Sequence, residues 1–397
     1  MAEQLRASRS MLHSVPEIER ALGSIWASAH ESRDAGGQHV LARTSVLNLV
    51  VVTGDEQSAR WCAETISGTA GRHASRSLIL STKDLKGPAG LDARIEALAL
   101  TSAGRAETGT ETIHISAHGE TGRHLASIIV PLLVRDLPVA LWWPVDPPFG
   151  SRRADELLPI ADRLIVDGSA WSGDGLGLLG RLAVEAQERH LVVADWALLR
   201  QARWREALAS VYDPPDLRPH LGAVRRIEVE YAATDPGDQK GTTNVVRPLY
   251  HVAWLASRLG MTVAAPLRRE NDGRRVATLR QKDHAVNVIL RPVVSDLGAG
   301  STARIEIVSR LRGAELIGTV AAGDRTVQVS IQEDGRERVR RSYLAPRLTD
   351  VDLLSRAVEE GAADSLAGHA LATANRLLGV DSGSHNTTDE HRNQDDD

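Results

Sequence analysis

The segment HISAHGETGRHL places three histidines close together, and histidine is a side chain that binds metals and transfers protons near neutral pH. On an extended strand His114 and His118 point to the same face, and His124 begins the helix that follows. No aspartate or cysteine stands at a spacing that would complete a ligand set. We therefore expect a histidine near each end of a strand, one in the first turn of a helix, and no metal site.

Arginine is well suited to bind anions, and Arg76 begins an apolar segment shortly after His73. The surrounding pattern matches neither a nucleophile elbow nor a phosphate-binding loop. Arg76 and His118 are candidates for an anion site at the edge of the N-terminal sheet. Arg76 could instead pair with a glutamate, but a surface role is favoured over both. Nowhere does the spacing bring a nucleophile, a base and an oxyanion donor together, so no catalytic residue is assigned.

The turn Val52-Thr53-Gly54-Asp55-Glu56 joins an expected strand to an expected helix, where a nucleotide phosphate would bind in a dinucleotide fold. It has one glycine where the fingerprint needs three, and it carries two carboxylates where the phosphate would lie. The chain also contains no phosphate-binding loop that ends in Gly-Lys-Ser or Gly-Lys-Thr. We expect no cofactor.

Two of the eight tryptophans stand side by side in the stretch LPVALWWPVDPP. On a strand Trp142 and Trp143 point to opposite faces, and Pro144 and Pro147 stiffen the loop that follows. Two interpretations stay open. Both indoles fill the space between sheet and helices, which is the favoured one, or one of them forms a rigid aromatic platform for a partner protein. On the second interpretation Trp143, next to Pro144, is the exposed member.

Apolar and β-branched runs alternate with helical periodicity through the first half of the chain, which predicts an α/β fold with a mainly parallel sheet and flanking helices. Pro131 is expected to kink or end its helix. The expected strands are 45–54, 75–82, 110–118, 137–143 and 162–169, and the expected helices are 55–68, 121–136 and 174–189.

Beyond the proline-rich segment DPPDLRPHLGAV the pattern changes to short strands separated by turns, with a helix near 243–260. Period-two spacing of Val327, Val329 and Ile331 predicts antiparallel strands with one wet face, hence a second α+β domain rich in antiparallel strands. A closing helix is expected at 350–378. The expected organisation is a helical N-terminal extension (1–43), an α/β domain (44–212), a linker (213–224), an α+β domain (225–380) and a disordered acidic tail (381–397).

Composition limits the class of protein. The length of 397 residues predicts two domains. A hydrophobic content of 42% and a net charge of -5 are typical of a globular protein. The chain has no apolar run long enough to span a membrane, and its N-terminus lacks the apolar core of a signal peptide, so a cytoplasmic location without membrane contact is expected.

Residues 221–350 carry a small excess of arginine without interleaved aromatic residues, which predicts no nucleic-acid partner. Cys62 is the only cysteine, so no internal disulfide can form.

Four blocks, RTSVLNLVVV (43–52), HASRSLIL (73–80), PLLVRDLPVALWWP (131–144) and ADRLIVDGS (161–169), resemble the OpcA family of glucose-6-phosphate dehydrogenase assembly proteins in order and separation. The resemblance implies a non-catalytic protein that binds glucose-6-phosphate dehydrogenase, the entry enzyme of the oxidative pentose phosphate pathway. It also implies allosteric activation of that enzyme by promotion of its active oligomer. Some members are thought to respond to thiol redox state, and this sequence departs from that pattern because it has Cys62 alone.

On this reading the contact residues for the dehydrogenase are Trp143, Trp142, Pro144 and Pro147. The alternative is a sugar-phosphate-binding enzyme or sensor that uses Arg76 and His118 at the sheet edge.

Overall fold

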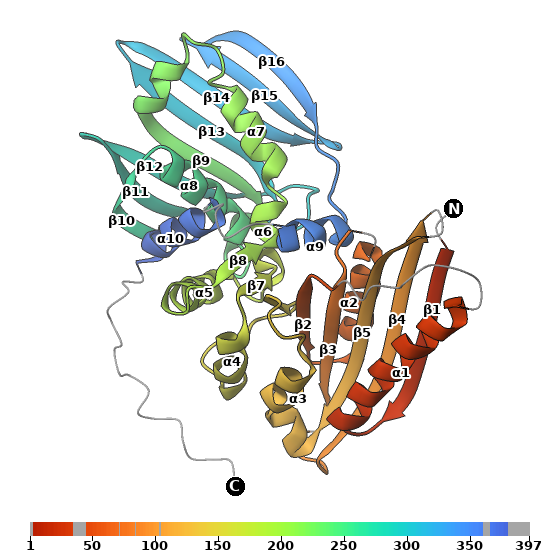
Figure 1. The fold of residues 1–397 in the computed structure, drawn as a ribbon. Helices are drawn as coiled ribbons and strands as arrows, with labels where there is room; N and C mark the ends of the chain where they lie inside the picture. The colour runs from red at the N-terminus through yellow and green to blue at the C-terminus, as the bar shows by residue number, and fades with distance from the viewer. Residues whose placement is uncertain are drawn as a thin grey trace, which may run out of the picture.

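The computed structural model describes residues 3–34, 45–70, 72–83, 85–102, 105–359 and 366–379. Within them the chain forms two eight-stranded sheets, sheet A and sheet B, with helices between them (Figure 1). The expected acidic tail at 381–397 lies outside the described residues.

Sheet A has the strand order β1-β4-β5-β3-β2-β6-β7-β8. The strands from β5 to β8 are parallel to their neighbours, whereas β4 and β1 extend one edge in antiparallel fashion. Every residue of β2 and β6 is buried, as the β-branched sequences of central parallel strands predict. The strands are β1 Glu3–Leu12, β2 Leu47–Thr53, β3 Ser75–Lys83, β4 Gly90–Ser102, β5 Arg105–His118, β6 Val139–Trp143, β7 Arg163–Val166 and β8 Val192–Asp195.

Helices cover both faces of the parallel part of sheet A. One face packs on α3 Leu125–Leu132, α4 Arg152–Leu157 and α5 Leu176–Glu188, and α1 Val15–Asp34 covers the antiparallel strands β1 and β4 beside them. The other face packs on α2 Glu56–Thr69, α6 Trp196–Leu199 and α9 Asp350–Glu359. On β4 only one face is buried, since Ala93 and Ile95 are covered while Asp92 and Arg94 are exposed. The antiparallel edge of the sheet therefore leaves a polar face open.

Sheet B has the order β10-β11-β12-β9-β13-β14-β15-β16, and all its pairs are antiparallel except β9 with β12. Val327, Val329 and Ile331 lie on its buried face, which confirms the period-two prediction. This inner face packs on α7 Ala202–Ser210, α8 Val246–Arg258 and α10 Leu366–Leu378 (Figure 1). The strands are β9 Val224–Ala232, β10 Thr262–Arg269, β11 Arg275–Gln281, β12 His284–Val293, β13 Thr302–Leu311, β14 Ala314–Gly323, β15 Thr326–Glu333 and β16 Arg336–Leu344.

The predicted fold class, an α/β domain followed by an α+β domain, is confirmed. Three local predictions are wrong. Residues 3–12 form an edge strand instead of part of a helical extension. The helix expected at 121–136 is limited to α3, which ends one residue after Pro131. The closing helix expected at 350–378 is two helices, and α9 returns to cover sheet A.

The chain passes between the sheets through the proline-rich segment, where residues 218–222 form a short 3-10 helix before β9 begins at Val224. Before this segment, α7 already packs on β14 and β15 of sheet B. The linker at 213–224 thus connects two parts that are packed together.

Candidate functional site

Both indoles of the tryptophan pair lie inside the protein. Trp142 is 0% exposed and Trp143 is 1% exposed, on opposite faces of β6. The less favoured interpretation, that Trp143 is an exposed platform, is therefore wrong, and the burial agrees with the favoured one, that both indoles fill the space between sheet and helices. Pro147 is also buried and Pro144 is half-buried. The physical reason is that β6 lies in the middle of a parallel sheet that is covered on both faces.

Trp142 is part of an aromatic cluster with two tryptophans from flanking helices. Its ring centroid lies 5.4 Å from that of Trp61 on α2 and 5.2 Å from that of Trp196 on α6. The indole nitrogen of Trp61 donates to Asp350 at the start of α9 over 3.0 Å. The cluster thus joins sheet A to a helix contributed by the far end of the chain, which makes Trp142 a packing residue.

Trp143 supports the loop that follows it. Its ring meets that of Phe149 edge to face at 6.0 Å, and Arg181 on α5 donates to the Phe149 carbonyl over 3.2 Å. The exposed part of the loop is Val145, which is 43% exposed, and Asp146. Beside the loop lies a mainly apolar groove of about 250 Å³, lined by Phe149, Gly150, Leu176, Gly177, Gly180, Arg181, Val184 and Glu185.

Arg76 is buried and holds two strands and a helix together. Its Nε donates to Glu111 on β5 over 2.7 Å, and its Nη1 donates to the carbonyl of Leu132 at the end of α3 over 2.8 Å. Beside it in the parallel register lies Asn48 of β2, which exchanges hydrogen bonds of 2.9 and 2.8 Å with the backbone of Val134. The blocks at 43–52, 73–80 and 131–144 therefore meet at this junction. The surface role favoured for Arg76 is wrong, because the side chain is buried and paired with Glu111.

His118 lies at the other end of the same pair of strands. It is seven residues along β5 from Glu111, the partner of Arg76, which corresponds to roughly 23 Å. Its Nε2 lies 3.1 Å from Asp92, which also contacts His13 at 3.0 Å. The joint anion site of Arg76 and His118 is therefore not assembled, because the two side chains belong to opposite ends of the sheet.

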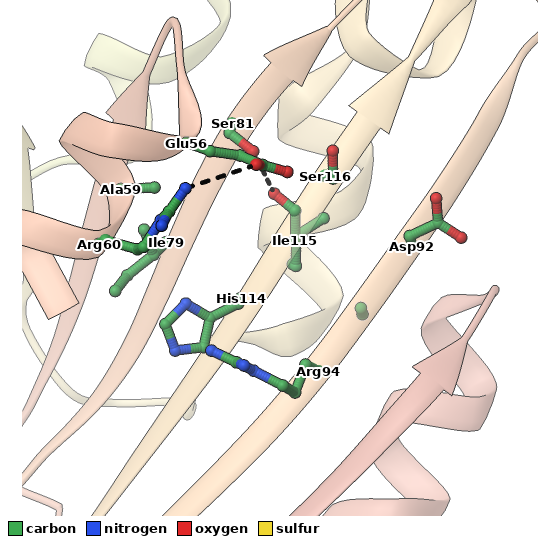
Figure 2. A pocket seen from close by; sticks show the side chains of 11 residues that line it. Glu56, Ala59, Arg60, Ile79, Ser81, Asp92, Arg94, His114, Ile115 and Ser116 are labelled. Atoms are coloured by element: carbon green, nitrogen blue, oxygen red, sulfur yellow. Dashed lines mark hydrogen bonds and ion pairs between the residues drawn. The ribbon is translucent and has the colours of Figure 1, made fainter.

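The open polar face of sheet A contains a groove of about 480 Å³ beside α2 (Figure 2). Figure 2 shows His114 of β5 in the groove, with Arg94 of β4 reaching toward its ring. Burial, and then the charge of Arg94, lower the pKa of His114. Its Nε2 is buried without a hydrogen-bond partner among the described residues. The groove is lined by Glu56, Ala59, Arg60, Ile79, Ser81, Asp92, Ala93, Arg94, His114, Ile115 and Ser116. The sequence offers His114 only as a candidate metal ligand, because Arg60 of α2 and Arg94 of β4 lie far from it along the chain.

A second polar cluster joins the carboxyl edge of sheet A to α8. Asp195, at the end of β8, is 1% exposed and accepts hydrogen bonds from Gly168 N at 2.9 Å, Ala197 N at 2.8 Å and the Tyr250 hydroxyl at 2.9 Å. A Cβ at position 168 would lie 2.7 Å from the Asp195 carboxylate, so this position requires glycine. In open α/β sheets this edge is where ligands bind. In this chain α8, from the second half, packs against this edge through the bond from Tyr250 to Asp195.

In the turn at 52–56, where a dinucleotide fold would bind phosphate, the side chain of Asp55 occupies the N-terminus of α2. Asp55 accepts the backbone N–H of Ser58 over 2.8 Å and its hydroxyl over 2.7 Å, so a carboxylate caps the N-terminus of α2. These hydrogen bonds lower the pKa of Asp55. Across the described ranges, no group of three or more His, Cys, Asp and Glu is arranged to hold a metal ion.

Two family models match the chain in succession. The glucose-6-phosphate dehydrogenase subunit N-terminal domain of OpcA matches residues 66–183, and the corresponding C-terminal domain matches residues 192–371. The chain belongs to the OpcA family. The OpcA N-terminal model covers most of sheet A, and the OpcA C-terminal model covers all of sheet B. This confirms the resemblance to the OpcA family, and three of the four sequence blocks, at 73–80, 131–144 and 161–169, lie within the matched residues.

Curated relatives match part of the chain. OxPP cycle protein OpcA of Synechocystis sp. is 28% identical over 152 residues, which are 38% of this chain and 30% of the relative. OxPP cycle protein OpcA of Synechococcus elongatus is 28% identical over 136 residues, which are 34% of this chain and 28% of that relative. The match spans less than a third of the length of these relatives.

Solved structures with a similar arrangement of elements include UDP-N-acetylglucosamine 3-dehydrogenase GnnA from Acidithiobacillus ferrooxidans. It is 12% identical, with a TM-score of 0.40, and the match covers 85% of this chain and 98% of that one. A super-repressor mutant of Gal80p from Saccharomyces cerevisiae is 9% identical with a TM-score of 0.34, over 79% of this chain and 85% of that one. Over the residues described, no helix is both long and apolar enough to cross a membrane.

Proposed function

We propose that this chain is a cytoplasmic, non-catalytic partner of glucose-6-phosphate dehydrogenase that promotes the active oligomer of that enzyme in the oxidative pentose phosphate pathway. The observation that carries the proposal is that OpcA family models match both halves of the chain in the expected order. The names of the cyanobacterial relatives support the pathway. Activation then requires that the chain bind the competent form of the dehydrogenase more tightly than the incompetent form.

We assign the contact to the surface of the tryptophan loop rather than to its indoles. Val145 is an exposed apolar side chain on the same loop as Phe149, which lines the groove of α5 and packs on the buried Trp143. Exposed apolar groups on a rigid loop are typical of protein interfaces, because little side-chain entropy is lost on binding. Trp142, Trp143 and Pro147 contribute to binding only through the shape of this loop.

Steady-state kinetics of the dehydrogenase from the same organism, titrated with this chain, test the proposal. We expect a saturable rise in kcat/KM and no turnover of glucose 6-phosphate by the chain alone. Val145→Asp is expected to weaken binding at least about tenfold, which corresponds to about 1.4 kcal/mol. Val130→Asp is the matched control, since Val130 is an exposed valine on α3, 50% exposed. Turnover by the chain alone, or kinetics that it leaves unchanged, would contradict the proposal.

A second candidate function is recognition of a small anionic metabolite in the groove of Figure 2. Arg60, Arg94 and the unpartnered His114 Nε2 line one opening, which supports this assignment better than Arg76 and His118 do. Calorimetric titration with glucose 6-phosphate, 6-phosphogluconate and inorganic phosphate tests it. Arg94→Gln should abolish any binding, and an absence of heat with all three probes would exclude this function.

A further inference from the structure

Arg247, the second residue of α8, is a half-buried arginine without a carboxylate partner. Its Nη1 donates to the hydroxyl of Ser301 over 3.3 Å, and its Nε is buried without a hydrogen-bond partner among the described residues. In the same part of the chain, no aspartate or glutamate forms an ion pair with its guanidinium. Burial of a charged group is costly unless another group compensates it, so an unpaired arginine here needs an explanation.

Two further arginines lie close to Arg247, at the junction between the two sheets. Arg200 ends α6, which contacts both α8 and α9, and Arg347 lies in the segment that leads from β16 to α9 (Figure 1). Burial lowers the pKa of Arg247, and the charge of Arg200 lowers it further. Asp167 opposes this shift and Arg347 adds to it. Three arginines therefore share one aspartate, which leaves an excess of two positive charges among these four groups.

Asp167 is already bound by Arg200. The Nη1 of Arg200 donates to both carboxylate oxygens of Asp167 over 2.7 Å and to the hydroxyl of Ser169 over 3.1 Å. Because all three bonds use the same nitrogen, the Nε and Nη2 of Arg200 have no hydrogen-bond partner within the described ranges. Asp195, the neighbouring carboxylate, is held by three hydrogen bonds of its own. Neither aspartate is therefore a partner for Arg247, and donors of Arg200 remain available to a ligand.

The first turn of α8 is fixed against the carboxyl edge of sheet A. Gln201, next to Arg200, donates to the carbonyl of Arg247 over 2.7 Å. Asn244, just before the helix, donates to the carbonyl of Gly168 over 2.9 Å. An arginine in the first turn of a helix lies at the positive end of the helix dipole, and α8 has no acidic residue in this turn. Arg247 is thus held in a position where its charge lacks a stabilising partner from the chain.

We propose that Arg247, Arg200 and Arg347 bind the phosphate group of a small molecule at the junction between the two sheets. A planar guanidinium donates to two phosphate oxygens at once, and a phosphate monoester carries a charge of about -1.5 to -2 near neutral pH. This charge matches the excess of two positive charges. The carboxyl edge of a parallel sheet is also the usual place for a ligand in open α/β folds. Arg347 is exposed, so a ligand reaches the site from solvent. The proposal does not depend on the dehydrogenase contact at Val145.

Calorimetric titration of the full chain with inorganic phosphate and with glucose 6-phosphate, in chloride buffer of constant ionic strength, is the first test. We expect saturable binding of at least one of these anions, and their comparison shows whether free phosphate or a phosphate monoester is the better ligand. Arg247→Gln should weaken binding at least about tenfold. Arg347→Gln, at an exposed position, should weaken binding without loss of stability. The absence of binding by both anions would overturn the proposal.

Arg94→Gln is the control, because Arg94 belongs to the groove of Figure 2. We expect it to bind phosphate like the wild type. The second candidate function predicts the opposite pattern, with loss of binding in Arg94→Gln and normal binding in Arg247→Gln. The same two variants therefore decide between the two sites, and the opposite pattern would contradict the present proposal.

Thermal unfolding separates ligand binding from a structural role of Arg247. Saturating phosphate should raise the melting temperature of the wild type by about 2 °C or more relative to chloride, and should leave that of Arg247→Gln unchanged. Without phosphate the variant should be at least as stable as the wild type, because it lacks a cation that lies among like charges. A variant that is less stable in chloride and still responds to phosphate like the wild type would show that Arg247 is structural, and the proposal would be wrong.

Discussion

The hydroxyl of Tyr250 on α8 donates a 2.9 Å hydrogen bond to the carboxylate of Asp195 at the end of β8. The bond is buried and links the two halves of the chain at the edge of sheet A. Beside it, Asn244 donates to the carbonyl of Gly168 over 2.9 Å. The relative position of the sheets therefore depends on a small polar cluster rather than on apolar packing alone.

The cluster predicts a pH dependence of stability. Burial raises the pKa of Asp195 from 3.8 to about 7, and the nearby Asp167 carboxylate adds to the rise. Between these values the folded chain holds a proton that the unfolded chain has lost, so stability decreases as pH rises. The free energy of unfolding decreases by at most about 1.4 kcal/mol per pH unit through this group, and the decrease is complete above about pH 7.

Urea unfolding of the wild type and of Asp195→Asn at pH 5, 6, 7 and 8 measures this effect. The variant lacks the titrating carboxyl, so its stability relative to the wild type should increase with pH over this range. A difference that does not change with pH would contradict the assignment.

Replacement of Arg76 by methionine should lower the free energy of unfolding by about 3 to 5 kcal/mol, because Glu111 would remain buried without its cation. The double variant with Glu111→Met should recover part of the loss. Arg94→Met is the control, since its ion pair with Glu96 is largely exposed and should contribute less than about 1 kcal/mol. Denaturant unfolding of the four proteins checks this, and equal effects of the two single substitutions would show that burial of the pair is unimportant.

Trp142→Ala and Trp143→Ala should each lower stability by about 3 to 5 kcal/mol, because both indoles are buried. Any loss of dehydrogenase binding should follow the fraction of unfolded chain. Thermal unfolding and binding measured on the same samples test this. A variant with an unchanged melting temperature and weakened binding would instead support the interpretation that its tryptophan contacts the dehydrogenase directly.

Oxidants and reductants should not alter dehydrogenase activation through this chain. Cys62 is 0% exposed, and burial raises the pKa of its thiol far above neutrality, so little reactive thiolate is present. Thiol titration of the folded chain should detect no reactive group, and Cys62→Ala should activate like the wild type. A redox response that disappears in Cys62→Ala would contradict this.

The sequence predicted the central parallel strands and β15 because their apolar periodicity is strong and uninterrupted. It missed β4, where small alanines alternate with Asp92, Arg94 and Glu96, and β10, where Pro266 lowers strand propensity. Adjacency correctly implied that Trp142 and Trp143 face opposite ways. Their burial depends on helices from distant parts of the chain.

The polar groove could not be predicted for a related reason. His114, Arg94 and Arg60 come from two strands and a helix, and no local spacing relates them. The sequence alone places Arg76 and His118 at one sheet edge, whereas the register of β3 and β5 puts them at opposite ends of these strands.

Sedimentation velocity of glucose-6-phosphate dehydrogenase from the same organism, with and without this chain, tests the central claim most directly. We predict that addition of the chain shifts the dehydrogenase to a larger species that contains both proteins, and that specific activity rises in proportion to that species. Val130→Asp should act like the wild type, and Val145→Asp should require at least about tenfold more protein. Separate sedimentation of the two proteins at every concentration, with unchanged activity, would contradict the account.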